Sequence, residues 1–480
     1  MNAISNADFY IDCHMRFSPF PHQETEFREH RDSQARALLW SMRCGKTKSC
    51  IDLACYLLEE QKIKTILIVA PNGVHENWVS REIPAHLWHS MRANVAFWRS
   101  SSKKIAEDIE ARIKEAKPLF LSINSEALML DRVLKLIGGL LKRGPALLIV
   151  DESHDFRRPG AKRTKRIRSL SRHFAYRRIL TGTLVENSPL AAYSQFEILQ
   201  PGALGVKTYG EFKYLYTETA FRPGARHGQE SIVGYKNLDK MSEKIARWSS
   251  KVGREGMPPF VHTVHDFEIK GPQWKMYQTL KKSFILALDS GKKVAAAEGG
   301  ARMIKMQQVL SGFIIDETGS VESLVPFEEN PRLLALSEVL ENLEGKSIIW
   351  CRFKEDIRLV KKLMEAKGLN SVEYHGGTSP KDRQASIEAF MKDPSCMIFI
   401  GQPKAGGTGI NLSSASNVIW YSHVFDAIDR AQASERATQI GGKSITITDL
   451  SAMHSLDNYI LSKLKDKKSI SSEVITAKDL

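Results

Sequence analysis

Short apolar runs recur through the first half of the chain, and each ends in polar or small residues. They span Thr65 to Pro71, Leu119 to Ile123, Ala146 to Glu152 and Arg177 to Thr183. Continuous runs of this kind are typical of parallel strands that are buried on both faces and carry functional loops at their carboxyl ends. The first half therefore predicts a doubly wound α/β domain.

A second set of such runs lies nearer the carboxyl terminus. It comprises Lys346 to Phe353, Ser371 to Gly376, Met397 to Gly401, Asn417 to Ser422 and Ser444 to Leu450. The chain has 480 residues, which is too long for one hydrophobic core, so we predict a second parallel sheet of the same type. The fold class is thus α/β with two tandem domains.

The stretch between the two sets, from about Pro201 to Arg332, has a helical pattern with two interruptions. The interruptions are rich in Gly and Pro and lie at Arg222 to Glu230 and Glu255 to Phe260. We expect helical insertions and a hinge, with the boundary at Pro258 and Pro259. The predicted domains are residues 1–258, with an insertion after about 200, and 259–480, with an insertion before about 345.

The charge balance favours a polyanionic partner. Lys and Arg number 69 against 55 Asp and Glu, a net charge of +14, and neutralising phosphates releases condensed counterions. No apolar run approaches the ~20 residues of a membrane span, and the amino terminus lacks a signal-peptide pattern. We expect a cytoplasmic protein without a membrane segment. The six cysteines lack zinc-site spacing and are expected to be reduced thiols.

Gly45-Lys46-Thr47 has the form of the end of a phosphate loop, and a helical pattern follows it. In such a loop Lys46 would hold the β- and γ-phosphates of ATP, and Thr47 would ligate Mg²⁺. The first glycine of the full motif is absent, because Trp40 stands in its place. A lone motif of this length also occurs by chance, so a second half-site is needed.

Asp151-Glu152-Ser153-His154 supplies that second half-site directly after an apolar strand. A strand-end carboxylate such as Asp151 can hold Mg²⁺ through water, and the adjacent Glu152 can polarise the attacking water. Either carboxylate alone could lie in a solvated turn. Two half-sites in the correct order, both at strand ends, predict ATP hydrolysis.

These motifs resemble those of the superfamily-two helicases, and specifically their Swi/Snf-like branch of DNA translocases. The further matching segments are Phe20 to Gln23, Ala70-Pro71 with Asn77-Trp78 and Glu82, Thr181 to Thr183 with Glu186-Asn187, Leu199 to Gly202, Gly406 to Leu412, and Gln432 to Arg436. The resemblance extends from Phe20 to about Ile440. It implies two RecA-like lobes that hold ATP and Mg²⁺ between them and grip one strand of a DNA duplex.

The resemblance also implies a role for each matching residue. The catalytic residues would be Lys46, Asp151, Glu152 and, as an arginine finger, Arg436. The nucleotide would be bound by Gln23 at the adenine and by Gly45, Lys46, Thr47, Gly409, Gln432 and Arg436. DNA would be contacted by Asn77, Ser122, Asn124, Ser125, Thr181, Gly182, Thr183, Gly406, Gly407 and Thr408, mainly at phosphates.

The sequence departs from the family pattern at three places, one of which is Gly442, where a glutamine is commonly seen. Gln439 stands where the sixth motif usually has its second arginine, which puts the rate of turnover in doubt. The segment from Ser122 to Leu128 is a loose version of the usual DNA-contacting motif. None of these departures removes a phosphate or metal ligand.

The segment from Arg157 to Arg178 contains many basic and no acidic residues. A block of one sign repels itself, so it favours an anionic partner, and we predict a track for the DNA backbone. Its candidate contacts are Arg157, Arg158, Arg163, Lys165 and Arg166. The alternative is a solvated helix face. Trp78, Trp274 and Trp350 are expected to pack in the core rather than stack on bases.

The sequence therefore predicts an ATP hydrolase that translocates on double-stranded DNA. Two alternatives stay open, a strand-separating helicase that acts on branched or single-stranded DNA or on RNA, and a nucleic-acid-binding module with weak ATPase activity. The chain is expected to act as a monomer.

Overall fold

A computed structural model describes residues 6–72, 74–99, 103–182, 184, 188–221, 230–253, 259–289, 296–406, 410–439, 442–462 and 464. The chain divides into two compact units between Glu255 and Gly256. Our predicted boundary at Pro258 and Pro259 stays a prediction. The two units are described separately.

Unit 1 is built on a seven-stranded sheet in the order β3-β4-β2-β5-β6-β1-β9, and every strand pair in it is parallel. The strands are β1 (Ala35–Trp40), β2 (Thr65–Ala70), β3 (Asn94–Phe97), β4 (Leu119–Asn124), β5 (Ala146–Val150), β6 (Tyr176–Leu180) and β9 (Ser249–Val252). Every residue of β2 and β5 is buried. Burial on both faces explains the continuous apolar runs.

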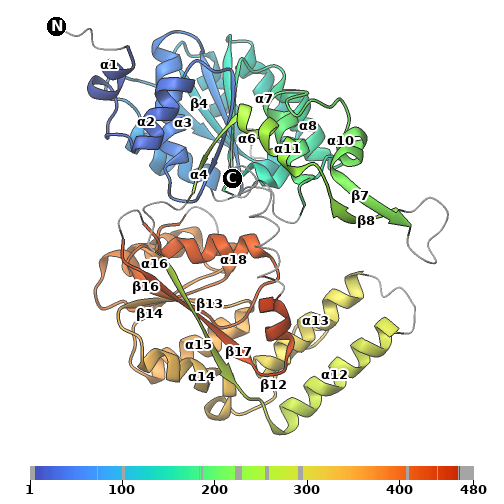
Figure 1. Ribbon diagram of the computed structural model, residues 1–480. Coiled ribbons are helices and arrows are strands. Elements are labelled where there is room, and N and C mark those ends of the chain that lie inside the picture. The colour runs from blue at the N-terminus through green and yellow to red at the C-terminus, as the bar shows by residue number, and fades with distance from the viewer. Residues whose placement is uncertain are drawn as a thin grey trace. The chain divides into compact units, whose positions relative to one another are not determined.

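Helices cover both faces of this sheet. They are α1 (Asn6–Cys13), α2 (Pro21–His30), α3 (Lys46–Glu59), α4 (Val74–Asn77), η1 (Trp78–Glu82), α5 (Ile83–His86), α6 (Lys103–Lys114), η2 (Ser125–Met129), α7 (Asp131–Leu141), η3 (Ser153–Phe156), α8 (Lys162–Ser171), α9 (Ala191–Leu199), α10 (Tyr209–Tyr216) and α11 (Leu238–Arg247). Figure 1 shows α2 and α3 on one side of the sheet and α7 and α8 on the other. The core contains side chains from β2, β4, β5, α7 and α9.

Unit 2 contains a six-stranded sheet in the order β10-β17-β16-β13-β15-β14, again with parallel pairs only. Its strands are β10 (Phe260–Phe267), β13 (Lys346–Trp350), β14 (Ser371–Tyr374), β15 (Ile398–Gly401), β16 (Ala415–Trp420) and β17 (Ile445–Ala452). Its helices are α12 (Gly271–Asp289), α13 (Ala296–Leu310), η4 (Phe327–Glu329), α14 (Pro331–Glu341), α15 (Lys354–Ala366), α16 (Pro380–Lys392), α17 (Pro403–Gly406), α18 (Ala427–Ser434) and η5 (Glu435–Ala437). Two α/β units with parallel sheets confirm the predicted fold class.

The region between the two predicted sets of strands contains more strand than its helical pattern indicates. The antiparallel hairpin of β7 (Thr217–Phe221) and β8 (Glu230–Tyr235) extends from unit 1 next to α10 (Figure 1). A second hairpin pairs β11 (Phe313–Ile315) with β12 (Val321–Ser323). β9 is an edge strand of the seven-stranded sheet, and β10 is an edge strand of the six-stranded sheet. Most residues of these strands are exposed or half-buried, so they lack the apolar runs of central strands.

Unit 2 is held together at its centre by a buried ion pair. Arg332, only 1% exposed, donates to Asp457 and to the carbonyl oxygens of Leu310 and Tyr421. These contacts connect the start of α14 to the end of α13, to the residue that follows β16, and to the segment after β17. Within the described residues, no helix is both long and apolar enough to cross a membrane.

Candidate active site

The phosphate loop runs from the end of β1 to the start of α3. Gly45 is the N-cap of α3 and has a left-handed backbone with φ of 74°. A Cβ at this position would lie 2.2 Å from Gln23 Nε2, so the loop requires glycine both for its backbone and for the approach of Gln23. The amino terminus of α3 directs unpaired backbone N–H groups at the loop, which suits a phosphate.

Lys46 lies at the first position of α3 and is buried. Its Nζ donates to the carbonyl oxygens of Trp40 at 2.8 Å and Ser41 at 3.1 Å. The ammonium group is thus held inside the loop that would enclose the β- and γ-phosphates. Thr47, next along the first turn, is half-buried.

Gln23, on α2, connects the preceding segment to the phosphate loop. Its Nε2 donates to the Gly45 carbonyl at 2.9 Å, and its Oε1 accepts from the Phe20 amide at 2.8 Å. His22 Nε2 lies 2.8 Å from the Cys44 carbonyl oxygen. Gln23 is only 3% exposed, and in this conformation its side-chain amide is hydrogen-bonded to the backbone of the loop. Its contact with adenine stays a prediction.

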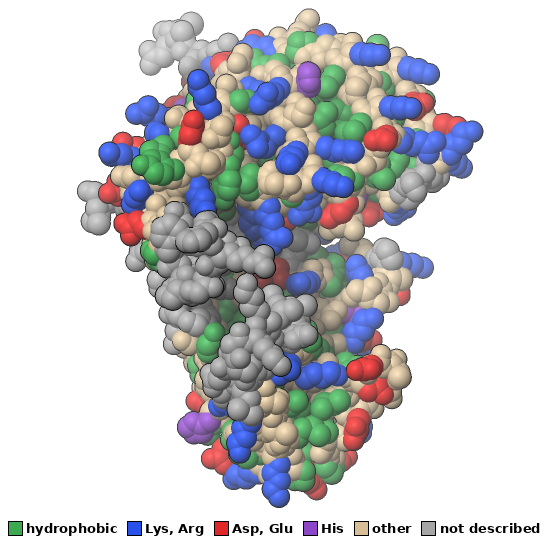
Figure 2. All heavy atoms as spheres, turned by 90° about the vertical axis from the view of Figure 1, so that its right-hand side faces the viewer, with side chains coloured by type: hydrophobic (Ala, Val, Ile, Leu, Met, Phe, Trp, Pro, Cys, Tyr) green, Lys and Arg blue, Asp and Glu red, His purple; other side chains and the backbone are tan. Residues whose placement is uncertain are grey.

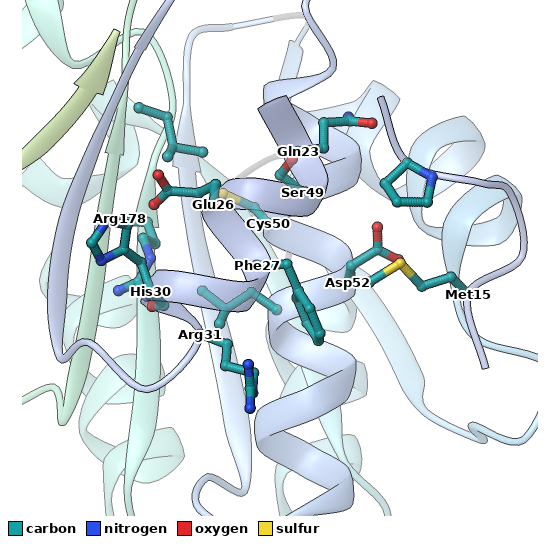
Figure 3. Close-up of a pocket in the computed structure, with 13 residues that line it drawn as sticks. Met15, Gln23, Glu26, Phe27, His30, Arg31, Ser49, Cys50, Asp52 and Arg178 are labelled. Atoms are coloured by element: carbon teal, nitrogen blue, oxygen red, sulfur yellow. Dashed lines mark hydrogen bonds between the residues drawn. The ribbon is translucent and has the colours of Figure 1, made fainter. Parts of the chain in front are cut away.

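A pocket adjoins Gln23 between α2, α3 and the sheet (Figure 3). It contains a group of buried charges that sequence analysis did not identify. Glu26 pairs with Arg36 at 3.3 Å, and Arg178, on β6, also lines the pocket. Burial lowers the pKa of Arg178 to about 10. The ion pair of Glu26 and Arg36 connects α2 to β1.

The acidic pair follows β5, and β6 lies between β5 and β1 in the sheet. Asp151 is 8% exposed, and both of its carboxylate oxygens accept hydrogen bonds. Trp78 Nε1 donates to Oδ2 at 2.9 Å, and the Glu152 amide donates to Oδ1 at 2.9 Å. Burial and the charge of Glu152 raise the pKa of Asp151 to about 6, while Trp78 and the nearby Lys46 favour its charged form.

Glu152 adopts a left-handed backbone conformation, with φ of 46°, which is uncommon for a residue other than glycine. Its Oε2 lies 3.2 Å from His154 Nδ1, and the same nitrogen lies 3.4 Å from Thr181 Oγ1. His154 therefore stands between the acidic pair and the segment that follows β6. Backbone strain of this kind is frequent at catalytic positions.

Thr181 and Gly182 follow β6 and lie beside the phosphate loop. The Thr181 amide donates to the Leu38 carbonyl at 3.2 Å, and Thr181 is fully buried. A Cβ on Gly182 would lie 3.4 Å from the Trp40 carbonyl oxygen. The structure thus brings together Lys46, Asp151, Glu152 and Thr181. Thr183, Glu186 and Asn187 lie outside the described residues.

The remaining predicted DNA contacts of unit 1 differ in exposure. Asn77 ends α4 and is half-buried, as is Asn124 at the end of β4. Ser122 and Ser125 are buried, and their hydroxyl groups have no hydrogen-bond partner among the described residues. Burial of Ser122 inside β4 does not favour contact between its side chain and DNA.

The basic block from Arg157 to Arg178 is less uniform than its sequence indicates. Arg163 approaches Glu126 at 3.8 Å, Arg166 approaches Asp131 at 3.8 Å, and Arg168 pairs with Glu197 at 3.0 Å. The fold places carboxylates from other segments near these arginines, so the charge of the block alone does not require an external anion, and contact between the block and DNA stays a prediction. Arg157 is half-buried, whereas Arg158 and Lys165 are exposed. Many Lys and Arg side chains lie on the side of unit 1 that carries α8 (Figures 1 and 2).

In unit 2, the sixth-motif segment spans α18 and η5. Gln432 and Arg436 are buried, and the Arg436 carbonyl accepts from the Leu412 amide at 3.1 Å. Gln439 is exposed. Gly406 ends α17, and Gly407, Thr408 and Gly409 lie outside the described residues.

Comparison with known protein families shows which family the chain belongs to. Residues 27–315, more than half of the chain, match the SNF2-related domain. The chain belongs to the SNF2-related family. Residues 331–441 match the helicase conserved C-terminal domain. The predicted membership of the Swi/Snf-like branch and the class of the enzyme, an ATP hydrolase of helicase superfamily two, are confirmed.

Relatives of this SNF2-related chain are distant and much longer. The SWI/SNF chromatin-remodeling complex subunit snf22 of Schizosaccharomyces pombe is 24% identical over 91% of the chain and 26% of its own length. The TATA-binding protein-associated factor MOT1 of Saccharomyces cerevisiae is 23% identical over 68% of the chain and 20% of its length. The chain spans about a fifth to a quarter of the length of these relatives.

Among solved structures, the Sulfolobus solfataricus SWI2/SNF2 ATPase core in complex with double-stranded DNA is 20% identical. The match covers 97% of this chain and 94% of that chain, with a TM-score of 0.42.

Sequence analysis expected Trp78, Trp274 and Trp350 to pack in the core, with Trp78 in a segment that resembles a family motif. Trp78 and Trp350 are buried, and Trp274 is half-buried. Sequence analysis missed the hydrogen bond from Trp78 to Asp151 and the place of His154 between Glu152 and Thr181. A signal for His154 was present, since it lies two residues after Glu152 in the strand-end segment. Trp78 carried no such signal, because its partner is distant in sequence.

Proposed function

We propose that this chain couples ATP hydrolysis to translocation on double-stranded DNA. The observation that carries the proposal is the convergence of Lys46, Asp151, Glu152 and Thr181 at the carboxyl edge of one parallel sheet. In doubly wound sheets ligands bind at this edge. The family to which the chain belongs supports the use of a nucleotide there.

Each group at this edge has a proposed role. Lys46 and the amino terminus of α3 bind the phosphates, and Gly45 and Gln23 shape the loop and the adenine end. The Thr47 hydroxyl and the Asp151 carboxylate are hard oxygen donors of the kind that Mg²⁺ prefers, and both follow a strand end. Bound Mg²⁺ would neutralise charge that develops on the phosphates.

Glu152 is the proposed general base. It lies next to the metal-binding carboxylate and beside His154, so it can orient a water and accept its proton. Arg436, on unit 2, is proposed to stabilise charge on the γ-phosphate, with Gln432 and Gly409 completing the nucleotide contacts. An arginine that arrives only on closure would couple hydrolysis to movement of the two units.

The DNA would be held mainly by its phosphates. The proposed contacts in unit 1 are Asn77, Asn124, Ser125, the Thr181 to Thr183 segment, and the basic residues Arg157, Arg158, Arg163, Lys165 and Arg166. Those in unit 2 are Gly406, Gly407 and Thr408. Because phosphate contacts carry no sequence information, the chain is expected to act on duplexes of any sequence. Two relatives are by name a chromatin-remodeling complex subunit and a nuclear protein, which supports a DNA substrate.

ATPase measurements with linear duplex DNA, single-stranded DNA, RNA and no nucleic acid test the proposal. We expect Mg²⁺-dependent hydrolysis that duplex DNA stimulates several-fold, and displacement of a triplex-forming strand from the duplex. Equal stimulation by RNA, or no stimulation, would contradict it. Unwinding of a forked duplex would instead favour the strand-separating helicase.

A further inference from the structure

Trp78 is a buried tryptophan that contacts the acidic pair. It is 1% exposed, and its Nε1 donates to Asp151 Oδ2 at 2.9 Å. Asp151 itself is fixed at its backbone, because its amide donates to the Val69 carbonyl at 2.8 Å. The Glu152 amide holds the other carboxylate oxygen. The indole N–H is therefore the one side-chain donor recorded for Asp151 among the described residues.

The local backbone explains how Trp78 reaches Asp151. Helix α4 ends at Asn77, and η1 continues from Trp78 to Glu82 as a turn of π-helix. The π-helix is rare, occurs mostly as single turns within α-helices, and is frequent at functional sites. Here it places an indole from the segment after β2 against the carboxylate that follows β5.

We propose that Trp78 is a positioning residue, whose indole N–H orients the Asp151 carboxylate for Mg²⁺. The inference rests on the proposed function, in which Asp151 binds the metal ion. Asp151 Oδ2 keeps a second lone pair while it accepts from the indole, so the same oxygen can still face the ion or its water. Loss of a partner that orients a metal ligand typically costs about 10- to 100-fold in metal affinity.

Trp88 provides a matched control in the same unit. It is also 1% exposed, and its Nε1 donates to a carboxylate, Asp52 Oδ1, at 3.0 Å. Asp52 is paired with Lys48 on α3. Substitution of Trp88 therefore removes the same chemical group from an equally buried carboxylate that has no proposed part in metal binding.

The test compares wild type, Trp78→Phe and Trp88→Phe in the full chain. Binding of a fluorescent ATP analogue is measured first in EDTA and then during titration with Mg²⁺. We expect Trp78→Phe to raise the Mg²⁺ concentration for half-maximal enhancement about 10-fold or more, with binding in EDTA unchanged. Trp88→Phe should titrate as wild type. Circular dichroism confirms that each variant is folded.

Three results separate the possible failures. If Trp78→Phe titrates as wild type, or if Trp88→Phe shifts equally, the inference is overturned while the proposed function stands. If wild type itself shows no effect of Mg²⁺ on nucleotide binding, the proposed metal site fails and the inference fails with it. Should Trp78→Phe misfold, 3-benzothienylalanine at position 78 replaces the N–H by sulfur in a ring of nearly the same shape, and the same shift is expected.

Discussion

Glu152 combines a left-handed backbone with a carboxylate beside His154. We expect Glu152→Gln to bind nucleotide normally and to lose about 10²- to 10⁴-fold in turnover, because an amide keeps the size of the side chain but cannot accept a proton. Steady-state ATPase assays and nucleotide-binding titrations measure the two effects. Glu110→Gln, an exposed substitution on α6 in the same unit, is the control. Wild-type turnover in Glu152→Gln would remove this residue from the mechanism.

Arg436 and Gln439 lie three residues apart, but the first is buried and the second exposed. If Arg436 is the arginine finger, Arg436→Ala should lower the ATPase rate about 10³- to 10⁵-fold and leave DNA binding without nucleotide unchanged.

Gln439→Arg should raise turnover if the missing guanidinium limits the rate. Turnover at saturating duplex decides both points. An Arg436→Ala enzyme at wild-type speed would show that we misaligned the sixth motif.

The roles of single residues could be predicted where chemistry is carried by short motifs. Lys46 follows a strand and a turn, and Asp151 ends an apolar run, so both positions were visible in the sequence. The contacts of Trp78 and His154 were not, because each depends on how separate strands align in the sheet. The exposed Gln439 was visible as a departure, but its surroundings were not.

Among the elements, α8 and the segment before it show how folding brings carboxylates close to residues of a basic segment. Arg163, Arg166 and Arg168 meet carboxylates from other segments, whereas Arg158 and Lys165 face solvent. We expect Arg158→Glu with Lys165→Glu to weaken duplex binding and to lower the slope of log affinity against log salt by about 0.9 per lost contact. Fluorescence anisotropy at several salt concentrations measures both quantities.

The control for that experiment reverses two exposed lysines outside the block, Lys104 on α6 and Lys135 on α7. This variant has the same net charge, so it reports the general effect of charge on DNA binding. Equal losses in the two variants would mean that the basic block has no special part in binding DNA.

The ion pair of Arg332 and Asp457 joins four segments of unit 2. Removing one member of a buried pair leaves the other charge without compensation, which typically costs about 3 to 5 kcal/mol. We expect Asp457→Ala to destabilise unit 2 by an amount of this order, seen as faster hydrogen exchange in β13 and β16. Glu341→Ala removes an exposed partner of Lys367 and should leave exchange unchanged.

Most central strands could be predicted from apolar runs. The strands that were missed show which features hide a strand in the sequence. β1 contains Arg36, whose charge interrupts the apolar pattern although it is buried against Glu26. β9 and β10 lie at the edges of their sheets, where half-buried residues suffice. Edge strands are stabilised by pairing with a neighbour that the sequence does not reveal.

At the scale of the whole molecule, each unit has its own hydrophobic core. Because the phosphate loop belongs to unit 1, a non-hydrolysable ATP analogue with Mg²⁺ should protect that unit first. At a ligand concentration of 100 times Kd the expected stabilisation is about 2.7 kcal/mol. Calorimetry with hydrogen exchange identifies the unit that is stabilised, and Lys46→Ala should abolish the effect. Stabilisation of unit 2 alone would contradict the location of the site.

The last strand of unit 1 also has a mechanical consequence. β9 runs parallel to β1, the strand that leads into the phosphate loop, and the chain continues from β9 towards unit 2. A pull on that connection would load β9 along its length, so its hydrogen bonds to β1 would resist in shear and share the force. Bonds loaded together yield at higher force than bonds opened one after another. If the chain works as proposed, the strand loaded by a working stroke would be the direct neighbour of β1, which leads into the phosphate loop.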